Sequence, residues 1–306
     1  MNAGPPLPET AQTDQAAPST ELPTVRGIAE VRAAVADWRH RGHSVGLVPT
    51  MGALHPGHLA LIRQSRADCG RTVASLFVNP TQFNDPKDLR AYPRDAAGDA
   101  ALFAAAGTDL LFAPAAEEVY PKGFATQVRV AGLGDCLCGA TRPGHMEGVA
   151  TVVAKLLNQV RPDIAYFGEK DFQQLQIIRR MAADLDLEVT IAGVPTVREP
   201  DGLALSSRNL LLTPDQRRAA PALHRTLVAA VAELAGGATA AGPASETARK
   251  EILAAGFRAI DYLELRAEAD LAALERADRP ARLFAAAWLG RVRLIDNVAV
   301  AAPTDL

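Results

Sequence analysis

The chain has 306 residues, more than a single hydrophobic core usually organises, so we expect two domains. Its formal net charge of −3, with 48% hydrophobic and 22% charged residues, is typical of a soluble globular protein and argues against a nucleic-acid or membrane partner. Three cysteines cannot all pair as disulfides, which favours the reducing cytoplasm, and no apolar run approaches the ~18 residues that span a bilayer.

Residues 1–22 are rich in Pro, Ala and Thr and lack the basic and apolar stretches of a secretory signal, so we predict a disordered tail. From residue 23 onward, short apolar runs alternate with segments of helical periodicity. The predicted helices cover residues 31–39, 57–67, 96–105, 148–160 and 172–185. The predicted strands cover residues 45–48, 72–78, 109–112, 163–167 and 188–192. This alternation predicts a Rossmann-like, doubly wound parallel α/β sheet in a first domain of residues 23–210.

A shift in composition after Thr213-Pro214 marks a second, smaller α+β domain of residues 211–306. It begins with an Ala-rich helix over residues 215–234, followed by a flexible break at Gly236-Gly237 and Gly242-Pro243. The remaining predicted elements are a helix over residues 244–255 and strands over residues 260–265, 282–288 and 292–295.

The most informative stretch is residues 49–58, Pro-Thr-Met-Gly-Ala-Leu-His-Pro-Gly-His, between a predicted strand and a predicted helix. Such a junction presents backbone N–H groups and the positive end of the helix dipole to an anion. His55 and His58 can donate to the same anion, which favours a site for chemistry at a phosphoryl group. The alternative is a tight turn whose histidines cap the helix.

Further polar motifs follow other predicted strands, at residues 77–83, 168–171 and 205–209. Lys170 can neutralise phosphate charge, Asp171 can accept from ribose hydroxyls, and the Ser-Ser-Arg run can donate to outer phosphates. Each motif alone could be a solvated turn or a helix cap. Together, at the carboxyl ends of parallel strands, they indicate a site for a nucleoside triphosphate.

The ordered set of motifs resembles the pantoate–β-alanine ligases, or pantothenate synthetases, within the HxGH/KMSKS nucleotidyltransferase superfamily. The resemblance runs from about residue 22 to residue 296, and its carriers are residues 49–58, 77–83, 92–94, 142–145, 168–175 and 197–209. It implies ATP-dependent condensation of (R)-pantoate with β-alanine through a pantoyl adenylate, giving pantothenate, AMP and pyrophosphate. It also implies Mg²⁺ as the phosphate-bound ion and a homodimer.

The resemblance also implies roles for individual residues. The ATP-binding residues would be Met51, Gly52, Ala53, Leu54, His55, Pro56, Gly57, His58, Gly168, Glu169, Lys170, Asp171, Val197, Leu205, Ser206, Ser207 and Arg208. Of these, the catalytic residues would be His55, His58, Lys170, Ser206, Ser207 and Arg208, with His58 as proton donor. Gln82 and Gln174 would bind pantoate. No Mg²⁺ ligand set is assigned, although Asp99 is a candidate.

Several alternatives stay open. A nucleotidyltransferase that stops at a nucleotidyl product, or a non-catalytic nucleotide-binding module, could carry the same phosphate motifs. Zinc at the histidine pair is disfavoured because H-E-x-x-H and a third ligand are absent, and a dinucleotide site is disfavoured because G-x-G-x-x-G is absent. His145 and Arg142 could serve pantoate or the structure alone. We expect surface positions for His40, His43 and His224.

Overall fold

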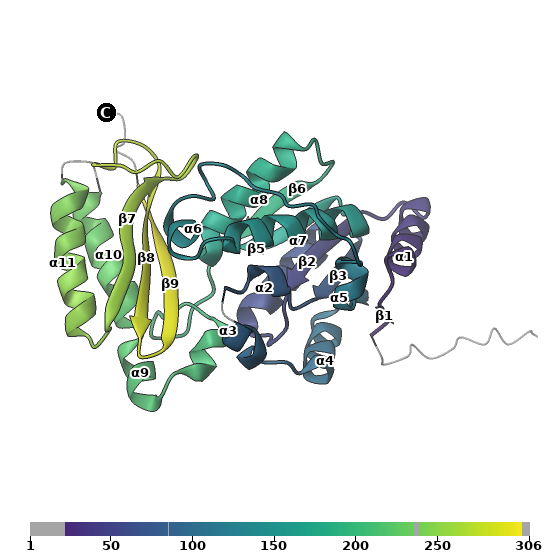
Figure 1. The fold of residues 1–306 in the computed structure, drawn as a ribbon, viewed down its shortest axis with the longest axis horizontal. Helices are drawn as coiled ribbons and strands as arrows, with labels where there is room; N and C mark the ends of the chain where they lie inside the picture. The colour runs from purple at the N-terminus through teal and green to yellow at the C-terminus, as the bar shows by residue number, and fades with distance from the viewer. Residues whose placement is uncertain (1–21, 85, 236–238, 302–306) are drawn as a thin grey trace, which may run out of the picture.

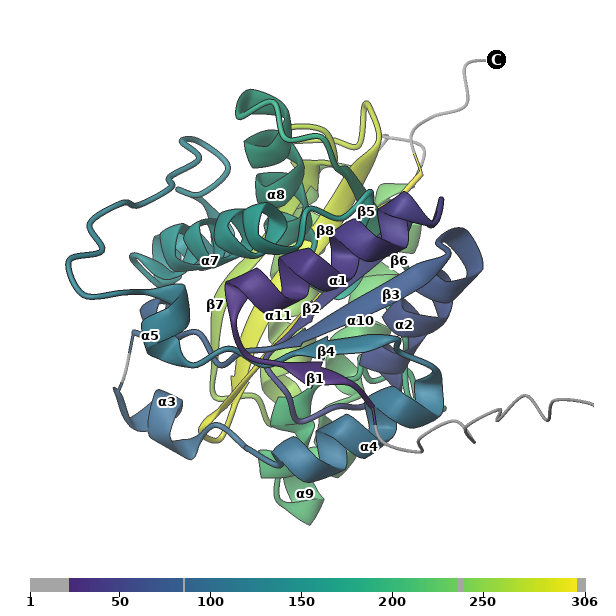
Figure 2. The same ribbon diagram turned by 90° about the vertical axis from the view of Figure 1, so that its right-hand side faces the viewer.

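The computed structural model describes residues 22–84, 86–235 and 239–301. Its larger sheet, at the right of Figure 1, has six parallel strands in the order β1-β4-β3-β2-β5-β6, and Figure 2 shows β4 between β1 and β3. The strands are β1 (Thr24–Val25), β2 (Val45–Thr50), β3 (Arg71–Leu76), β4 (Leu110–Phe112), β5 (Ile164–Gly168) and β6 (Thr190–Val194). The predicted doubly wound parallel sheet is therefore confirmed, and β2, beside the topological switch, lies at its centre.

Helices cover both faces of this sheet, as Figure 2 shows. One face packs against α1 (Ile28–His40), α7 (His145–Val160) and α8 (Phe172–Asp184). The other face packs against α2 (Pro56–Asp68) and α4 (Ala96–Ala106). Successive strand residues alternate between the two cores: Leu47 belongs to the first and Val48 to the second, as a strand buried on both faces requires.

The ten helices and strands predicted for this part of the chain are all present, with ends displaced by a few residues. The shortest elements escaped prediction because a single turn shows no hydrophobic period. These are β1, α3 (Pro86–Ala91), α5 (Ala116–Val119), α6 (Leu137–Thr141) and the 3₁₀ turns η1 (Pro80–Gln82), η2 (Glu169–Asp171) and η3 (Ser207–Leu211). The predicted tail lies outside the described residues except for Leu22, which is buried.

A second sheet is antiparallel and contains β7 (Ala259–Ala267), β8 (Ala281–Leu289) and β9 (Val292–Val300) in that order. One face packs on α10 (Ala222–Leu234) and α11 (Ala241–Ala254). The opposite face turns toward α8, where Phe284 of β8 packs against Phe172 with ring centroids 6.1 Å apart. The small sheet therefore joins its own helices to the larger sheet's core.

Two details of the second predicted domain are wrong. The helix expected over residues 215–234 is two helices, α9 (Pro214–Ala219) and α10, because Pro221 has no N–H and its ring obstructs the preceding turn. Gly242-Pro243 was expected in a flexible break but lies in the first turn of α11, where a proline costs no hydrogen bond. Gly236-Gly237 lies outside the described residues. Within the described chain, no helix has both the length and the apolarity needed to cross a membrane.

Candidate active site

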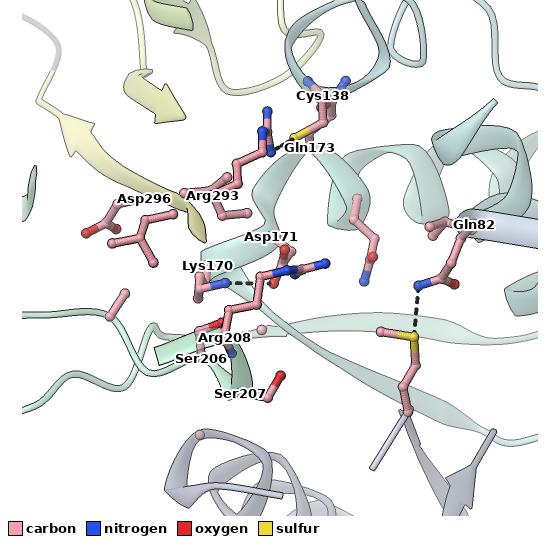
Figure 3. Close-up of a pocket in the computed structure, with 18 of the residues that line it drawn as sticks. Gln82, Cys138, Lys170, Asp171, Gln173, Ser206, Ser207, Arg208, Arg293 and Asp296 are labelled. Carbon is pink, nitrogen blue, oxygen red and sulfur yellow. Dashed lines mark hydrogen bonds and ion pairs between the residues drawn. The ribbon is translucent and has the colours of Figure 1, made fainter. Parts of the chain in front are cut away.

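Residues from both sheets line one cavity of about 900 Å³ beyond the carboxyl ends of β2, β3 and β5. In the view of Figure 3, Lys170 and Arg208 are drawn on one side of the space and Gln82 on the other. Most of the predicted site residues line this cavity: Met51, His55, Gly57, His58, Gln82, Gly168, Lys170, Asp171, Gln174, Val197, Leu205, Ser206, Ser207 and Arg208. Five do not, namely Gly52, Ala53, Leu54, Pro56 and Glu169.

The turn after β2 is held from behind by Asp99, a buried residue in the first turn of α4. Its carboxylate accepts the N–H groups of Ala53 at 3.0 Å and Leu54 at 2.9 Å. Gly52 turns the chain with a φ of +85°, and a Cβ there would lie 2.6 Å from Asp99 Oδ2. Both oxygens of Asp99 support the turn, and Asp99 does not line the cavity, so its role as a metal ligand stays a prediction that these contacts do not support. The expectation that the backbone N–H groups of this junction are free to face a bound anion is wrong for Ala53 and Leu54, because Asp99 accepts both.

The two histidines lie at the start of α2, and each has one ring nitrogen engaged. His55 Nδ1 accepts the N–H of Gly57 at 3.2 Å, and His58 Nδ1 accepts the N–H of His55 at 3.3 Å. A ring nitrogen that accepts carries no proton, so each neutral ring has its proton on Nε2. The capping alternative thus holds for His55, and the same contacts make Nε2–H the hydrogen-bond donor of both rings.

Both rings are neutral at pH 7. Burial lowers the pKa of His55 to about 4, with a further contribution from the positive charge of Lys170. Burial also lowers the pKa of His58 to about 3, helped by the adjacent His55 and by Lys170. The ring centroids are 4.1 Å apart, so two charged rings would repel strongly. The pair therefore offers two neutral donors, and the nearby positive charge comes from Lys170.

Lys170 and its neighbours form the 3₁₀ turn η2 between β5 and α8. The Lys170 ammonium is 3.7 Å from the Asp171 carboxylate, and its side chain is mostly buried. Glu169 faces the small sheet instead, where its carboxylate pairs with Arg282 at 3.2 Å. Glu169 was predicted to bind ATP, and this ion pair explains why it does not line the cavity.

The serine–arginine loop follows a short hairpin. Leu205 donates its N–H to the carbonyl of Val197 at 3.0 Å, and Arg198 bridges to Ala204 in antiparallel fashion. Ser206 is the N-cap of η3, and its hydroxyl accepts the N–H of Arg208 at 3.3 Å. Ser206 is thus a helix cap as well as a cavity residue.

Gln82, the last residue of η1, lies on the other side of the cavity from Lys170. Asn79, to which the sequence motifs assigned no role, donates from Nδ2 to Gln82 Oε1 at 3.0 Å and to the carbonyl of Gly148 at 3.0 Å. These contacts turn the Gln82 amide so that its NH₂ lies 2.9 Å from the sulfur of Met51. Gln82 is therefore placed as a donor toward the cavity. Asn79 directly follows Phe77-Val78 at a strand end, a position that could have identified it.

Other polar residues differ in their outcome. His145 lines the cavity and also holds the carbonyl of Gln82 at 2.8 Å and Arg142 at 2.9 Å, so its structural role is present and a role toward pantoate stays a prediction. Burial lowers the pKa of His145 to about 4, and the charge of Arg142 adds to the effect. The surface position expected for His224 is wrong, because it lines the cavity 3.5 Å from Asp296.

No three His, Cys, Asp or Glu side chains among the described residues are grouped so that they could hold a metal ion. Carboxylates in and behind the cavity already have partners: Asp99 has backbone N–H groups, Asp171 has Lys170 and Asp296 has Arg198. The residues present therefore do not form a dedicated metal site of the kind that binds through several carboxylates.

A family model described as pantoate–β-alanine ligase matches residues 23–299. The curated pantothenate synthetase of Chelativorans sp. (strain BNC1) is 56% identical over 282 residues, which cover 92% of this chain and 99% of that protein. That of Cereibacter sphaeroides (strain ATCC 17029 / ATH 2.4.9) is 56% identical over 278 residues, covering 91% and 99%.

Solved structures agree with these relatives. The pantothenate synthetase of Thermus thermophilus superposes with a TM-score of 0.85 at 49% identity, covering 91% of this chain and 99% of that one. The pantoate–β-alanine ligase of Francisella tularensis, complexed with "Beta-gamma ATP and Beta-alanine", gives 0.77 at 32% identity, covering 92% and 100%. With a matching family model over nine-tenths of its length and relatives above half identity, the chain belongs to the pantoate–β-alanine ligase family.

Proposed function

We propose that this ligase condenses (R)-pantoate with β-alanine at the expense of ATP, through an enzyme-bound pantoyl adenylate, and releases AMP and pyrophosphate. The observation that carries the proposal is the convergence of two kinds of group on one cavity. Phosphate-binding groups (His55, His58, Lys170 and the Ser206–Arg208 loop) face the neutral amides Gln82 and Gln174 across it. The crystallised Francisella relative, named with an ATP compound and β-alanine, supports the choice of substrates.

In the first step a pantoate carboxylate oxygen attacks the α-phosphorus of ATP. A bond forms between that oxygen and the phosphorus, and the bond to the β-phosphate oxygen breaks as pyrophosphate leaves. The Nε2–H groups of His55 and His58 stabilise charge on the phosphate oxygens, and one such donor typically contributes about 10²- to 10³-fold in rate. Lys170 and Arg208 neutralise the triphosphate and the departing pyrophosphate.

The low pKa of His58 bears on its implied role as proton donor. A ring with a pKa of about 3 carries no spare proton at pH 7, so in the free enzyme His58 is a hydrogen-bond donor. The negative charge of bound triphosphate raises the pKa of a neighbouring imidazole. Proton donation by His58 therefore belongs to the ATP complex.

Gln82, held by Asn79, donates to pantoate, and Gln174 binds on the same side. Neutral amides satisfy the substrate oxygens without burying another charge. In the second step the β-alanine amine attacks the acyl carbon of the adenylate, forms the amide, loses a proton and displaces AMP. Holding both reactants in one cavity makes this step effectively intramolecular and limits hydrolysis of the mixed anhydride.

We propose that Mg²⁺ enters as part of the substrate, bound to the phosphates of ATP, because the described residues offer no cage for it. Resemblance to the family further supports a homodimer acting in the cytoplasm. The division into domains at residues 210 and 211 is supported by a separate hydrophobic cluster in the small sheet and its helices, whose members apart from Leu203 all lie beyond residue 211.

The test is to incubate the protein with ATP and pantoate, with and without β-alanine, and to identify the products. Pantothenate together with AMP, and pyrophosphate release with pantoate before β-alanine is added, are the expected result. A nucleotidyl product that accumulates and does not react with β-alanine would favour the transferase alternative, and binding of ATP without turnover would favour the binding module.

A further inference from the structure

Building on the ATP site proposed above, we propose that Asp296 and Asn297 are positioning residues for the reaction. They are neighbours on β9, the strand of the small sheet that lies nearest the larger sheet in Figure 1. Asn297 fixes the turn that carries Lys170, and Asp296 fixes the hairpin that leads to Ser206, Ser207 and Arg208. One dipeptide thus sets the spacing of the two phosphate-binding segments.

Asn297 is 3% exposed, and each of its polar atoms is engaged. Its Nδ2 donates to the carbonyl of Glu169 at 2.9 Å and to the carbonyl of Lys170 at 3.0 Å. Its Oδ1 accepts from Arg282 at 2.7 Å, which fixes which end of the amide faces the turn. Two successive carbonyls of η2 are thereby held by one side chain, so the backbone of Lys170 has a fixed position.

Arg282 is itself held in place, so the Asn297 amide that it contacts cannot rotate freely. Its guanidinium pairs with Glu169 at 3.2 Å and Glu268 at 2.8 Å, and it lies 4.0 Å from the ring centroid of Phe172. The contact with Glu169 comes from the same turn that Asn297 holds. The small sheet therefore grips η2 through both a backbone and a side-chain contact.

Asp296 is 4% exposed and accepts two hydrogen bonds from Arg198, at 2.6 and 2.9 Å. Arg198 also donates to the carbonyl of Gly202 at 3.1 Å, which closes the hairpin of residues 197–205. A bidentate arginine–carboxylate pair defines direction as well as distance. The start of the serine–arginine loop is therefore tied to β9.

The side chains of Asp296 and Asn297 lie on opposite faces of β9, as those of neighbouring strand residues must. Asp296 lies opposite Ala285 of the α10-facing core and contacts His224 of α10. Asn297 lies opposite Phe284, which faces α8. Because β9 is an edge strand, it can reach both segments from its free side. Figure 3 shows Asp296 on the small-sheet side of Lys170 and Arg208.

The decisive variant is Asn297→Asp, which keeps the size but sets an oxygen against two carbonyls. Loss of both donors is expected to raise the KM for ATP by about 10- to 100-fold and to leave the KM for pantoate within about twofold. The matched control is Asn79→Asp, another buried asparagine whose Nδ2 also holds a backbone carbonyl. It should raise the KM for pantoate instead. Equal effects of both variants on both substrates would overturn the proposal.

A double-mutant cycle separates positioning from plain stability. If Asn297 acts through Lys170, then Asn297→Asp should change the KM for ATP by no more than about twofold in a Lys170→Ala background. The change in the KM for ATP that Asp296→Asn causes should likewise disappear in an Arg208→Ala background. If the fold-changes in the KM for ATP of the two single variants multiply fully in both double variants, then β9 stabilises the fold without positioning Lys170 or Arg208.

Two further measurements keep the outcomes distinct. If Asn297→Asp does not fold by circular dichroism, Asn297→Ser, which retains one donor, takes its place with a smaller expected rise in the KM for ATP. Pyrophosphate release by the unmodified protein with ATP and pantoate is measured in parallel. Absence of that release contradicts the proposed function, whereas normal release with an unchanged KM in the variants contradicts the positioning role alone.

Discussion

His55 and His58 illustrate how a residue can serve the fold and the chemistry with different atoms. The Nδ1 of each ring accepts a main-chain N–H at the start of α2, and that contact decides which nitrogen carries the proton. Neither ring could swap its proton to Nδ1 without breaking a helix-capping contact. The direction of the donors is thus fixed before any substrate arrives, which is the preorganisation that charge stabilisation requires.

Replacing His58 by alanine removes one Nε2–H donor and the acceptor for the His55 N–H. We expect the rate of adenylate formation to fall by about 10²- to 10³-fold, while ATP binding weakens by less than about tenfold. Single-turnover pyrophosphate release and equilibrium ATP binding measure the two quantities. Near-normal release would contradict the assignment of His58.

Replacing Gln82 by alanine removes a donor on the opposite side of the cavity. The KM for pantoate should rise by about 10-fold or more, because a polar substrate group loses its partner, and the affinity for ATP should change little. Steady-state kinetics with each substrate varied in turn provide the measurement. If ATP binding collapsed while the pantoate dependence stayed normal, the assignment of Gln82 to the pantoate subsite would be wrong.

Sequence motifs identified residues that line the cavity better than residues that hold them in place. Lys170 and Ser206 stand in motifs beside strand ends, so their positions could be predicted. Asp99, Asn79 and Asn297 act through contacts with segments 45, 69 and 128 residues away. Such contacts leave no local pattern, so the sequence offered Asp99 only as a candidate metal ligand and did not reveal its hold on the turn after β2.

At the scale of elements, η1 and α7 approach unusually closely. A Cβ on Gly148 would lie 2.5 Å from the carbonyl oxygen of Thr81 and 2.8 Å from the N of Gln82, and both of these are backbone atoms. Gly148 is therefore required for Gln82 to reach the cavity. The glycine's role is contact distance, since its backbone is helical.

Gly148→Ala should push η1 away from α7 and cost about 1–3 kcal/mol of stability, as overpacking usually does. The KM for pantoate should rise more than the KM for ATP. Gly242→Ala is the matched control, because Gly242 also lies in a helix and a Cβ there meets no atom within 4 Å. Thermal unfolding and kinetics of the two variants should differ clearly, and identical behaviour would contradict the packing argument.

The longer elements could be predicted because their hydrophobic period persists over several turns or a full strand. The break at Pro221 was missed because the alanine-rich composition on both sides favours one continuous helix. The turns η1, η2 and η3 have no period to detect, yet they carry Gln82, Lys170 and Arg208. The site thus depends on elements that sequence periodicity cannot reveal.

For the whole molecule, the buried imidazoles couple stability to pH. The pKa values of His55, His58 and His145 are about 4, 3 and 4 in the folded state, below the ordinary value of 6.5. The unfolded chain therefore binds more protons below pH 6.5. The contribution of these three neutral imidazoles to the free energy of unfolding is fully present above that pH, and it is lost progressively as the pH falls toward 4.

The expected result is a free energy of unfolding that decreases from about pH 6.5 to about pH 4.5, measured by urea denaturation. His145→Gln, which keeps a polar side chain at this position, should reduce the steepness of that decrease. An unchanged slope in the variant would show that His145 does not contribute.

β9 follows the last strand of the larger sheet by about a hundred residues, so during synthesis on the ribosome it becomes available later than that sheet. A nascent polypeptide can form the six-stranded sheet and its helices early, since N-terminal regions fold first and every strand of that sheet precedes residue 195. Residues 296 and 297 emerge about a hundred residues later. Until then the segments bearing Lys170 and Arg208 lack these contacts, so an unfinished chain should bind and hydrolyse ATP less well than the full chain.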